Sequence, residues 1–254
     1  MDDIAPRLLE VFLDVQRGLP RQGPGDDAST HRALALCGEL PEDASVLDIG
    51  CGPGMQTLAL ADQLAGKITA VDTCEEYLNE LREKISERGL SDRVQVENAD
   101  MAALGFPPAT FDLIWCEGAA YIMGIAQALK TWWPLLREQG DLAFTELVWL
   151  KESPATEIAE FFADAYPAMT TPAAIKETIR AHGYTPIADF TLPDSCWWDN
   201  YYTPLAAKLP PLKQKYATDE EALGIVGMTE TEIDMRRRFG DSYGYQFFVS
   251  RVAS

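Results

Sequence analysis

From residue 45 onward, the sequence alternates short apolar segments with longer segments that can form helices. Five segments have the composition of buried strands: residues 45–49, 67–71, 93–97, 111–115 and 141–148. The helical segments between them cover residues 55–65, 74–88 and 121–137. Alternation of this kind is typical of a parallel sheet with helices on both faces. We therefore predict an α/β fold.

The sequence on either side of this pattern predicts further elements. Before it we expect a helix at 3–16, a glycine- and proline-rich loop at 17–27, and a helix capped by Ser29 or Thr30 that ends at Gly38. After it we expect helices at 154–164 and 172–182 and strands at 185–191 and 243–252. Residues 193–242 are too long for a hairpin connection, so we predict an inserted cap with a helix near 217–238.

Composition limits the classes of partner. Asp and Glu total 40 against 21 for Lys and Arg, and the formal net charge is -19, which repels phosphate backbones and anionic lipids. We expect no nucleic-acid or membrane partner, and we interpret the short run Arg236, Arg237, Arg238 as a solvated helical face. The N-terminus lacks a basic leader, and no apolar run approaches the roughly 20 residues of a membrane span. A soluble cytoplasmic protein is the expectation.

The sequence has few cysteine and histidine residues that could form a disulfide or bind a metal ion. The five cysteines are odd in number and scattered, so we expect reduced thiols rather than a disulfide framework or a zinc site. The two histidines, His31 and His182, fall near helix ends and are interpreted as surface or helix-terminal residues. We predict no metal site.

A glycine-rich turn, VLDIGCGPGMQ at residues 46–56, follows the first predicted strand. A dinucleotide-binding loop requires G-x-G-x-x-G, but Met55 stands where its third glycine would be, which makes a nicotinamide-dependent dehydrogenase a distant alternative. Gly54 instead completes G-x-G-x-G, with Asp48 before it. This arrangement resembles motif I of class I S-adenosylmethionine-dependent methyltransferases. The resemblance implies a cofactor-binding loop that contains Asp48, Gly50, Cys51, Gly52, Gly54 and Gln56.

The ends of the next strands supply residues where the same family binds its cofactor. By resemblance, Asp72 accepts hydrogen bonds from the ribose hydroxyls, with Thr73 beside it, and Asp100 and the backbone of Met101 meet the adenine. Cys116 and Glu117 follow in the same register after the fourth strand. A lone Asp in such a position is more often a helix cap. Here, however, Asp72, Asp100 and Glu117 follow successive strands in the same register, and this common position at the carboxyl edge of the sheet favours a cofactor site.

The resemblance runs from about residue 17 to the C-terminus. The segments LPRQGPGDD, EGAAY, DAYP, GYTPIADFTLPDSCWWDNYY and YGYQFFV resemble a subgroup of bacterial methyltransferases with small-molecule-type architecture. It implies one domain, residues 1–254, with a Rossmann-like, mostly parallel sheet and an antiparallel last strand. The core would be 41–192 and 243–254, the helical lid 1–40, and the substrate-side cap 193–242. Gln22 and Gly23 of the lid would lie near the methionine end of S-adenosylmethionine, and S-adenosylhomocysteine would be the product.

Several residues are candidates for the chemistry. Methyl transfer is an in-line displacement, and it needs a base only if the attacking atom must lose a proton. Glu117 is the first candidate for a base or an acceptor-orienting group, and a cofactor or lid hydrogen-bond partner is an equal alternative. Tyr121 and Glu146 are weaker candidates. Trp197, Trp198, Tyr201 and Tyr202 could line an acceptor pocket or anchor the cap, whereas we interpret Tyr166 and Trp149 as packing residues.

Three functional hypotheses follow. The first is transfer of a methyl group to a small-molecule acceptor. The second is a protein or RNA acceptor, which predicts an open groove beside Glu117. The third is a non-catalytic module that binds S-adenosylmethionine or S-adenosylhomocysteine. The residues leave open whether N, O, S or C is methylated, and they are compatible with a homodimer.

Overall fold

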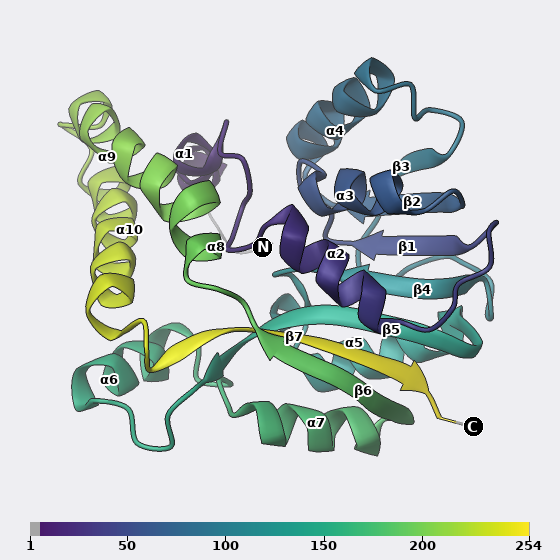
Figure 1. The fold of residues 1–254 in the computed structure, drawn as a ribbon. Helices are drawn as coiled ribbons and strands as arrows, with labels where there is room; N and C mark the ends of the chain where they lie inside the picture. The colour runs from purple at the N-terminus through teal and green to yellow at the C-terminus, as the bar shows by residue number, and fades with distance from the viewer. Residues whose placement is uncertain (1–5, 254) are drawn as a thin grey trace.

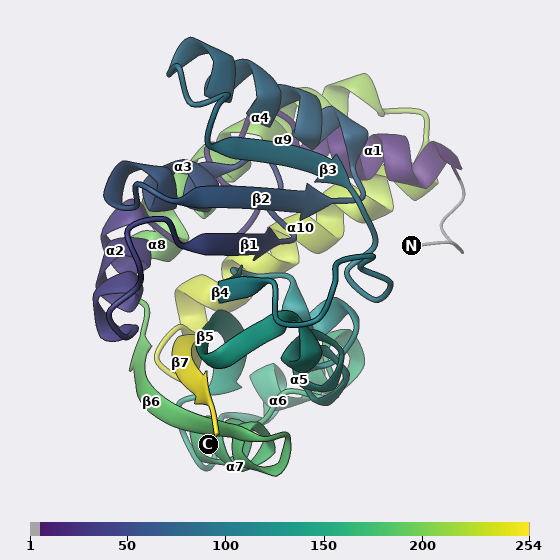
Figure 2. The same ribbon diagram turned by 90° about the vertical axis from the view of Figure 1, so that its right-hand side faces the viewer.

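The computed structural model describes residues 6–253, which form a seven-stranded sheet with helices on both faces (Figure 1). The strand order is β3-β2-β1-β4-β5-β7-β6 (Figure 2). Strand β7 runs antiparallel to both of its neighbours. The strands are β1 Ser45–Ile49, β2 Lys67–Asp72, β3 Val94–Asn98, β4 Phe111–Cys116, β5 Leu136–Trp149, β6 Tyr184–Thr191 and β7 Tyr243–Val252. The predicted fold class, including the antiparallel last strand, is confirmed.

The helices form three layers around this sheet (Figure 1). The first face carries α2 Asp27–Leu36, α3 Met55–Gln63 and α4 Glu75–Glu87, and the second carries α5 Ile125–Trp132 and α7 Pro172–Ala181. The third layer stands beyond the carboxyl ends of the parallel strands. It contains α1 Pro6–Gln16, α9 Thr203–Lys215 and α10 Glu220–Phe239, with α8 Ser195–Trp197 and the π-helix η3 Trp198–Tyr202 leading into it. The remaining elements are α6 Thr156–Ala165 and the 3-10 turns η1 Ala120–Ile122 and η2 Trp133–Leu135.

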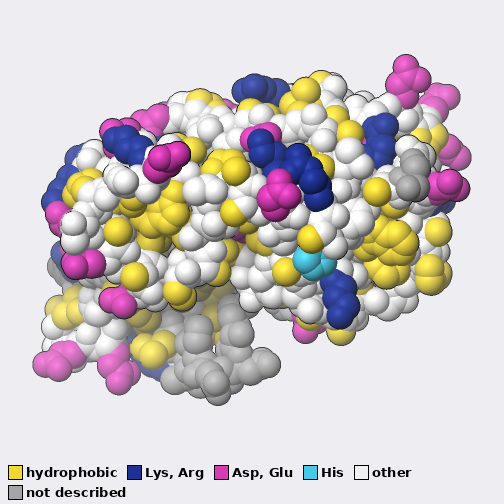
Figure 3. Space-filling view, turned by 90° about the horizontal axis from the view of Figure 1, so that it is seen from below, with side chains coloured by type: hydrophobic (Ala, Val, Ile, Leu, Met, Phe, Trp, Pro, Cys, Tyr) yellow, Lys and Arg dark blue, Asp and Glu magenta, His cyan; other side chains and the backbone are white. Residues whose placement is uncertain are grey.

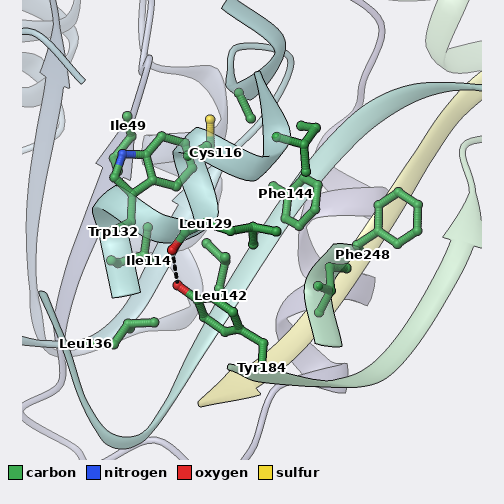
Figure 4. Packing of buried hydrophobic residues seen from close by; sticks show 14 of the residues in the cluster. Ile49, Ile114, Cys116, Leu129, Trp132, Leu136, Leu142, Phe144, Tyr184 and Phe248 are labelled. Carbon is green, nitrogen blue, oxygen red and sulfur yellow. Dashed lines mark hydrogen bonds between the residues drawn. The ribbon is translucent and has the colours of Figure 1, made fainter. Parts of the chain in front are cut away.

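The second face of the sheet holds one apolar core, in which buried strand residues meet α5 and α7 (Figure 4). Leu142, Phe144 and Val148 alternate along β5 so that all three point to this face. Within the core, the Tyr184 hydroxyl donates to the carbonyl of Leu129 at 3.1 Å, which satisfies a buried polar group. Burying each large apolar side chain stabilises the fold by roughly 1.5–3 kcal/mol.

A separate apolar cluster joins the N-terminal helix to the inserted segment. Val11 and Val15 of α1 are buried against residues of α9 and α10 such as Leu205 and Val226. The helix predicted near 217–238 corresponds to α10, whereas α9 was not predicted. Pro210 and Pro211 lie inside α9, and proline lacks the N–H that an interior helical position donates. The amphipathic pattern therefore indicates no helix there, and α9 depends on packing in this cluster.

Three local expectations were wrong. Helix α2 begins at Asp27 and is capped by Asp26, whose carboxylate accepts from the N–H of Ser29 at 2.7 Å, so neither Ser29 nor Thr30 is the cap. Strand β5 begins at Leu136, inside the segment predicted to be helical. Arg236 is 5% exposed and stacks 3.9 Å from the Trp197 ring centroid, so only the other two arginines of that run lie on a solvated face. The predicted first helix corresponds to α1, with its residues 3–5 outside the described range.

Candidate functional site

The glycine loop after β1 is held in a conformation that favours glycine. Gly50 and Gly54 have φ values of +70° and +87°, in the left-handed region. A Cβ added at Gly50 would lie 2.4 Å from Ala119 Cβ, and one at Gly54 would lie 2.1 Å from Leu81 Cδ1. These two glycines therefore allow the turn to pack tightly against the loop after β4 and against α4.

Gly52, at the middle of the loop, has open space around it. Its φ is +52°, and the nearest atom to a Cβ built there is Gln22 Cγ, 3.7 Å away. Gln22 itself accepts a hydrogen bond from the Tyr77 hydroxyl at 3.1 Å, and Gly23 follows it with no atom within 4 Å of a built Cβ. The structure thus places the RQGPG segment directly over the centre of the glycine loop, as a lid there would require.

Asp72, at the end of β2, is fixed by two backbone donors. The N–H of Gly52 donates to Oδ2 at 2.9 Å, and the N–H of Cys74 donates to Oδ1 at 2.9 Å. A carboxylate has about four acceptor positions, so each oxygen retains capacity for one more donor. Two vicinal ribose hydroxyls fit this remaining capacity. Thr73 is exposed beside it.

Asp48 lies beneath the loop and is fully buried. The Thr57 hydroxyl donates to Oδ2 at 2.5 Å, and Gln56 Nε2 lies 3.4 Å from Oδ1. Burial, together with the nearby charge of Glu117, raises the pKa of Asp48 to about 7, against the opposing effect of the Thr57 bond. Burial also raises the pKa of the Cys51 thiol well above its usual value, and the same holds for Cys116. Both thiols are therefore packing groups in their protonated form.

Asp100 and Met101 follow β3 beside the glycine loop. The Asp100 carboxylate is exposed and accepts from the N–H of Ala102 at 2.8 Å. The carbonyl of Met101 accepts from Trp132 Nε1 at 3.0 Å, and Met101 Cε lies 3.9 Å from a Cβ built at Gly50. The ends of β1, β2 and β3 are thus brought to one edge, and the adenine contacts of Asp100 and Met101 stay a prediction.

Glu117, just after β4, is surrounded by donors. Its Oε1 accepts from Thr30 Oγ1 at 2.6 Å and from Trp115 Nε1 at 2.9 Å, and its Oε2 accepts from the Arg21 guanidinium at 2.9 Å. The side chains of Glu117 and Arg21 are each only 6% exposed. This environment favours the alternative of a lid hydrogen-bond partner, since three side-chain donors already occupy the two carboxylate oxygens. The role of Glu117 as a base stays a prediction.

The lid segment is also attached to the inserted segment. The N–H of Gly25 donates to the carbonyl of Cys196 at 3.2 Å, and Asn200 Nδ2 donates to the carbonyl of Gly25 at 3.1 Å. A Cβ at Gly25 would lie 2.9 Å from an Arg21 nitrogen and 3.3 Å from Glu117 Oε2. The lid, the inserted segment and the end of β4 therefore form one connected structure.

Glu146, near the end of β5, has a different environment. The Tyr166 hydroxyl and the N–H of Leu147 both donate to Oε1, at 2.8 and 3.1 Å. Glu146 is only 1% exposed, and its Oε2 is buried without a hydrogen-bond partner. Burial raises the pKa of Glu146 to about 7. The Tyr121 ring packs edge-on against Tyr166, with centroids 5.9 Å apart. Tyr166, interpreted as a packing residue, thus binds a candidate catalytic carboxylate.

The aromatic residues of the inserted segment divide into two groups. Tyr201 and Tyr202 are buried, and the Tyr202 hydroxyl donates to Glu232 of α10 at 2.6 Å. Trp197 stacks on Tyr245 with centroids 5.3 Å apart. Trp198 instead lines an outer groove with Arg236 and Arg237. Trp197, Tyr201 and Tyr202 belong to the buried cluster of α1, α9 and α10, which fits an anchoring role, and a role of the four aromatic residues in an acceptor pocket stays a prediction.

Comparison with known proteins shows which family the central part of the chain resembles. Residues 46–140 match the family described as a methyltransferase domain. Over these residues, the chain is similar to a methyltransferase domain. The 27-O-demethylrifamycin SV methyltransferase of Amycolatopsis mediterranei is 31% identical over 137 residues, 51% of this chain and 48% of that protein. The malonyl-[acyl-carrier protein] O-methyltransferase of Pseudescherichia vulneris is 38% identical over 120 residues, 47% of this chain and 45% of that protein. The chain spans about half the length of these relatives.

Solved structures match nearly the whole chain, including the segments on either side of residues 46–140. An S-adenosylmethionine-dependent methyltransferase from Thiobacillus denitrificans has a TM-score of 0.81 at 17% identity, over 98% of this chain and 99% of that one. One from Geobacter sulfurreducens has a TM-score of 0.80 at 19% identity, over 99% and 100%. Both were solved with S-adenosylhomocysteine, the product expected from the sequence. The [4+2]-cyclase SpnF also matches, with a TM-score of 0.75 at 19% identity over 97% and 93%, so the fold alone does not define the reaction.

The sequence alone did not predict four residues whose roles depend on contacts with distant parts of the chain. Arg21 and Thr30 bind Glu117 across 96 and 87 residues of sequence, respectively. Glu232 meets Tyr202 from another helix, and Tyr245 meets Trp197 from another strand. The RQGPG segment was a signal for Arg21, because it already indicated a lid. Nothing in the sequence near Glu232 distinguishes it from the exposed acids of α10.

Proposed function

We propose that the chain is an S-adenosylmethionine-dependent methyltransferase that acts on a small-molecule acceptor. The observation that carries this proposal is the edge formed by β1 to β4. There a glycine loop with open space over Gly52, and a preorganised Asp72 with unused acceptor capacity, lie under the lid residue Gln22. The backbone and carboxylate groups present fit the amino acid and ribose parts of S-adenosylmethionine. When bound, that cofactor supplies an electrophilic methyl group.

The chain's own residues would position the reactants and exclude water. The glycine loop and Asp72 would orient the donor, and Gln22 and Gly23 would cover its methionine end. Glu117 would hold the lid closed through Arg21 and Thr30, since these are its partners in the structure. A closed, dry site favours the transfer because alignment, rather than a protein nucleophile, provides most of the catalysis.

The surface supports a small acceptor over a nucleic acid. On the face seen in Figure 3, acidic side chains lie among the Lys and Arg side chains, which form no continuous band there. Among residues 6–253, no helix has the length and apolarity that crossing a membrane requires. All five cysteines are free, which fits the cytoplasmic location that we include in the proposal. Light scattering after gel filtration would decide between a monomer and a homodimer.

Methyl-labelled S-adenosylmethionine, incubated with the protein and a metabolite extract, tests this function. We expect label in a discrete small product, and its mass would identify the acceptor. Asp72→Asn should abolish the transfer, whereas Asp92→Asn, at an exposed position in the turn before β3, should not. Label recovered only in protein or RNA would contradict the proposal and support a macromolecular acceptor. S-adenosylhomocysteine binding without transfer to any fraction would support the non-catalytic alternative.

A further inference from the structure

A cluster of tyrosines and two carboxylates lies between the carboxyl edge of the sheet and the third helical layer. Glu146 approaches it from β5 and Glu232 from α10. The Tyr166 hydroxyl donates to Glu146 at 2.8 Å, and the Tyr166 ring packs against Tyr121 with centroids 5.9 Å apart. The Tyr202 hydroxyl donates to Glu232 at 2.6 Å, and the Tyr202 ring lies 5.8 Å from that of Trp197, which stacks on Tyr245. Tyr245 in turn pairs with Leu147, the neighbour of Glu146. Burial and, after it, the charges of both carboxylates raise the pKa of the Tyr121 and Tyr245 hydroxyls. We name Glu146, Glu232, Tyr121 and Tyr245 the acidic tyrosine cluster.

In and beside this cluster, two buried hydrogen-bond acceptors lack a donor. Glu146 Oε2 is an acceptor in a residue that is 1% exposed, and no donor reaches it. Gln16 Oε1 of α1, in a residue that is 7% exposed, is a second buried acceptor without a donor. Gln16 is a hydrogen-bond partner of Tyr201. The Tyr201 ring packs against that of Tyr202, the partner of Glu232, with centroids 4.9 Å apart. A buried acceptor without a partner is unfavourable, so a ligand that brings N–H or O–H donors would be favoured here.

The charge balance distinguishes among such ligands. Burial raises the pKa of Glu146 against the hydrogen bonds from Tyr166 and Leu147, and it raises the pKa of Glu232 against the hydrogen bond from Tyr202. Neither carboxylate has an Arg, Lys or His partner among the described residues. This contrasts with Glu117, whose charge Arg21 already offsets. A positively charged ligand would compensate both carboxylates, whereas a carboxylate or phosphate ligand would add to their repulsion. The faces of nearby aromatic rings attract cations as well.

From this juxtaposition we infer that the methyl acceptor is an organic amine, bound as a cation between Glu146 and Glu232 and against Tyr121. The inference rests on the proposed methyltransferase function and specifies its substrate class. The transferable proton of the ammonium passes to Glu146 Oε2, which leaves a lone pair on nitrogen. That lone pair forms the new C–N bond to the methyl carbon as the C–S bond of the donor breaks, and the electron pair of that bond stays on sulfur. The product is a methylated ammonium and S-adenosylhomocysteine, and Glu146 releases the proton to water.

Two properties of Glu146 suit this role. Its unpartnered oxygen faces no competing donor, and a carboxyl group with a pKa near 7 exchanges protons readily at neutral pH. The ends of β4 and β5 are also tied together, since the N–H of Gly118 donates to Thr145 Oγ1 at 2.8 Å. Glu146 is therefore held beside the strand end that carries Glu117 and the lid.

Fractionation of a metabolite extract by charge tests the inference. The extract is separated into cationic, neutral and anionic fractions, and each is incubated with methyl-labelled S-adenosylmethionine and the full chain. We expect label in the cationic fraction. Glu146→Gln should reduce that label at least 100-fold and change the dissociation constant for S-adenosylhomocysteine less than twofold. Glu138→Gln is the matched control, because Glu138 is an exposed residue of the same strand.

The outcomes separate the inference from the function on which it rests. Label confined to the neutral or anionic fraction, with S-adenosylhomocysteine bound normally, would overturn the amine acceptor and leave the methyltransferase intact. Full activity of Glu146→Gln on the cationic fraction would overturn the role of Glu146. A folded chain that binds no S-adenosylhomocysteine would overturn the proposed function itself. Binding without label in any fraction would overturn both.

Discussion

Glu117 and Glu146 stand near the ends of neighbouring parallel strands, yet their environments differ. Glu117 accepts three hydrogen bonds from side chains, one of them from a buried arginine, and links the lid to the sheet. Glu146 has one oxygen bound to Tyr166 and Leu147 and the other buried without a partner. The first carboxylate is satisfied by the protein, whereas the second keeps one oxygen without a donor, where we propose that the acceptor binds. A carboxylate at the edge of such a sheet therefore has to be judged by its partners rather than by its position.

The largest expected effect comes from breaking the Glu117 pair. Arg21→Met should lower the free energy of unfolding by about 3–5 kcal/mol, because it leaves Glu117 buried without its cation. The double variant Arg21→Met, Glu117→Gln should recover a substantial part of that loss. Urea unfolding of both variants and of Glu146→Gln measures the free energies of unfolding that are to be compared. A loss below 1 kcal/mol for Arg21→Met would show that the pair does not hold the lid.

An effect of similar or smaller size is expected in the glycine loop. Gly54→Ala should lower the free energy of unfolding by about 2–5 kcal/mol, since it combines left-handed strain with a clash against Leu81. Gly89→Ala is the matched control: Gly89 has a φ of +67° but open space around it, so only the strain of about 1–2 kcal/mol should remain. Equal losses in the two variants would contradict the close packing assigned to Gly54.

Asp48 predicts a pH dependence of stability. Its folded pKa, about 7, is raised above the unfolded value of about 4, so its contribution to stability is fully present below pH 4 and is lost as pH rises towards 7. Between these values, the free energy of unfolding should fall by up to about 1.4 kcal/mol per pH unit from this group. Asp48→Asn should flatten that slope in unfolding curves recorded from pH 5 to 8. Parallel slopes for the two proteins would contradict the assignment.

The smallest effect should come from an arginine pair that water can reach. Arg238 pairs with Glu157 on the outside of α10, where the two side chains are 44% and 48% exposed. Arg238→Ala should lower the free energy of unfolding by less than about 1 kcal/mol, since solvent and salt screen this pair. The same urea series measures it beside Arg21→Met. Similar losses for the two arginines would remove the distinction between the buried and the exposed pair.

The region around β1 and β2, where we propose that the methyl donor binds, could be predicted well from the sequence. The bounds of β1 and β7 were predicted in full, because period-2 or continuous apolar patterning and flanking glycines are local signals. The positions of Gly50, Gly54 and Asp72 follow from the same local rule, that residues after parallel strands share one edge. Their positive φ values and backbone contacts agree with that rule.

The layer of α1, α9 and α10 and the surroundings of Glu146 could not be predicted in the same way. Helix α9 contains two interior prolines and is stabilised by burial against α1 and α10, which no local pattern encodes. Arg236 lies in a run of three arginines, and only its contact with Trp197 distinguishes it from its neighbours. The environment of Glu146 likewise depends on Tyr166, 20 residues away. Such contacts arise from tertiary packing and require the three-dimensional structure.

The central claim is that the edge from β1 to β4 binds the methyl donor and that Glu146 serves the acceptor instead. Calorimetric titration of S-adenosylhomocysteine into the wild-type chain, Asp72→Asn and Glu146→Gln tests it most directly. We predict binding by the wild-type chain, at least tenfold weaker binding by Asp72→Asn, and an unchanged dissociation constant for Glu146→Gln. No binding by the folded wild-type chain, or an equal loss in the two variants, would contradict the account.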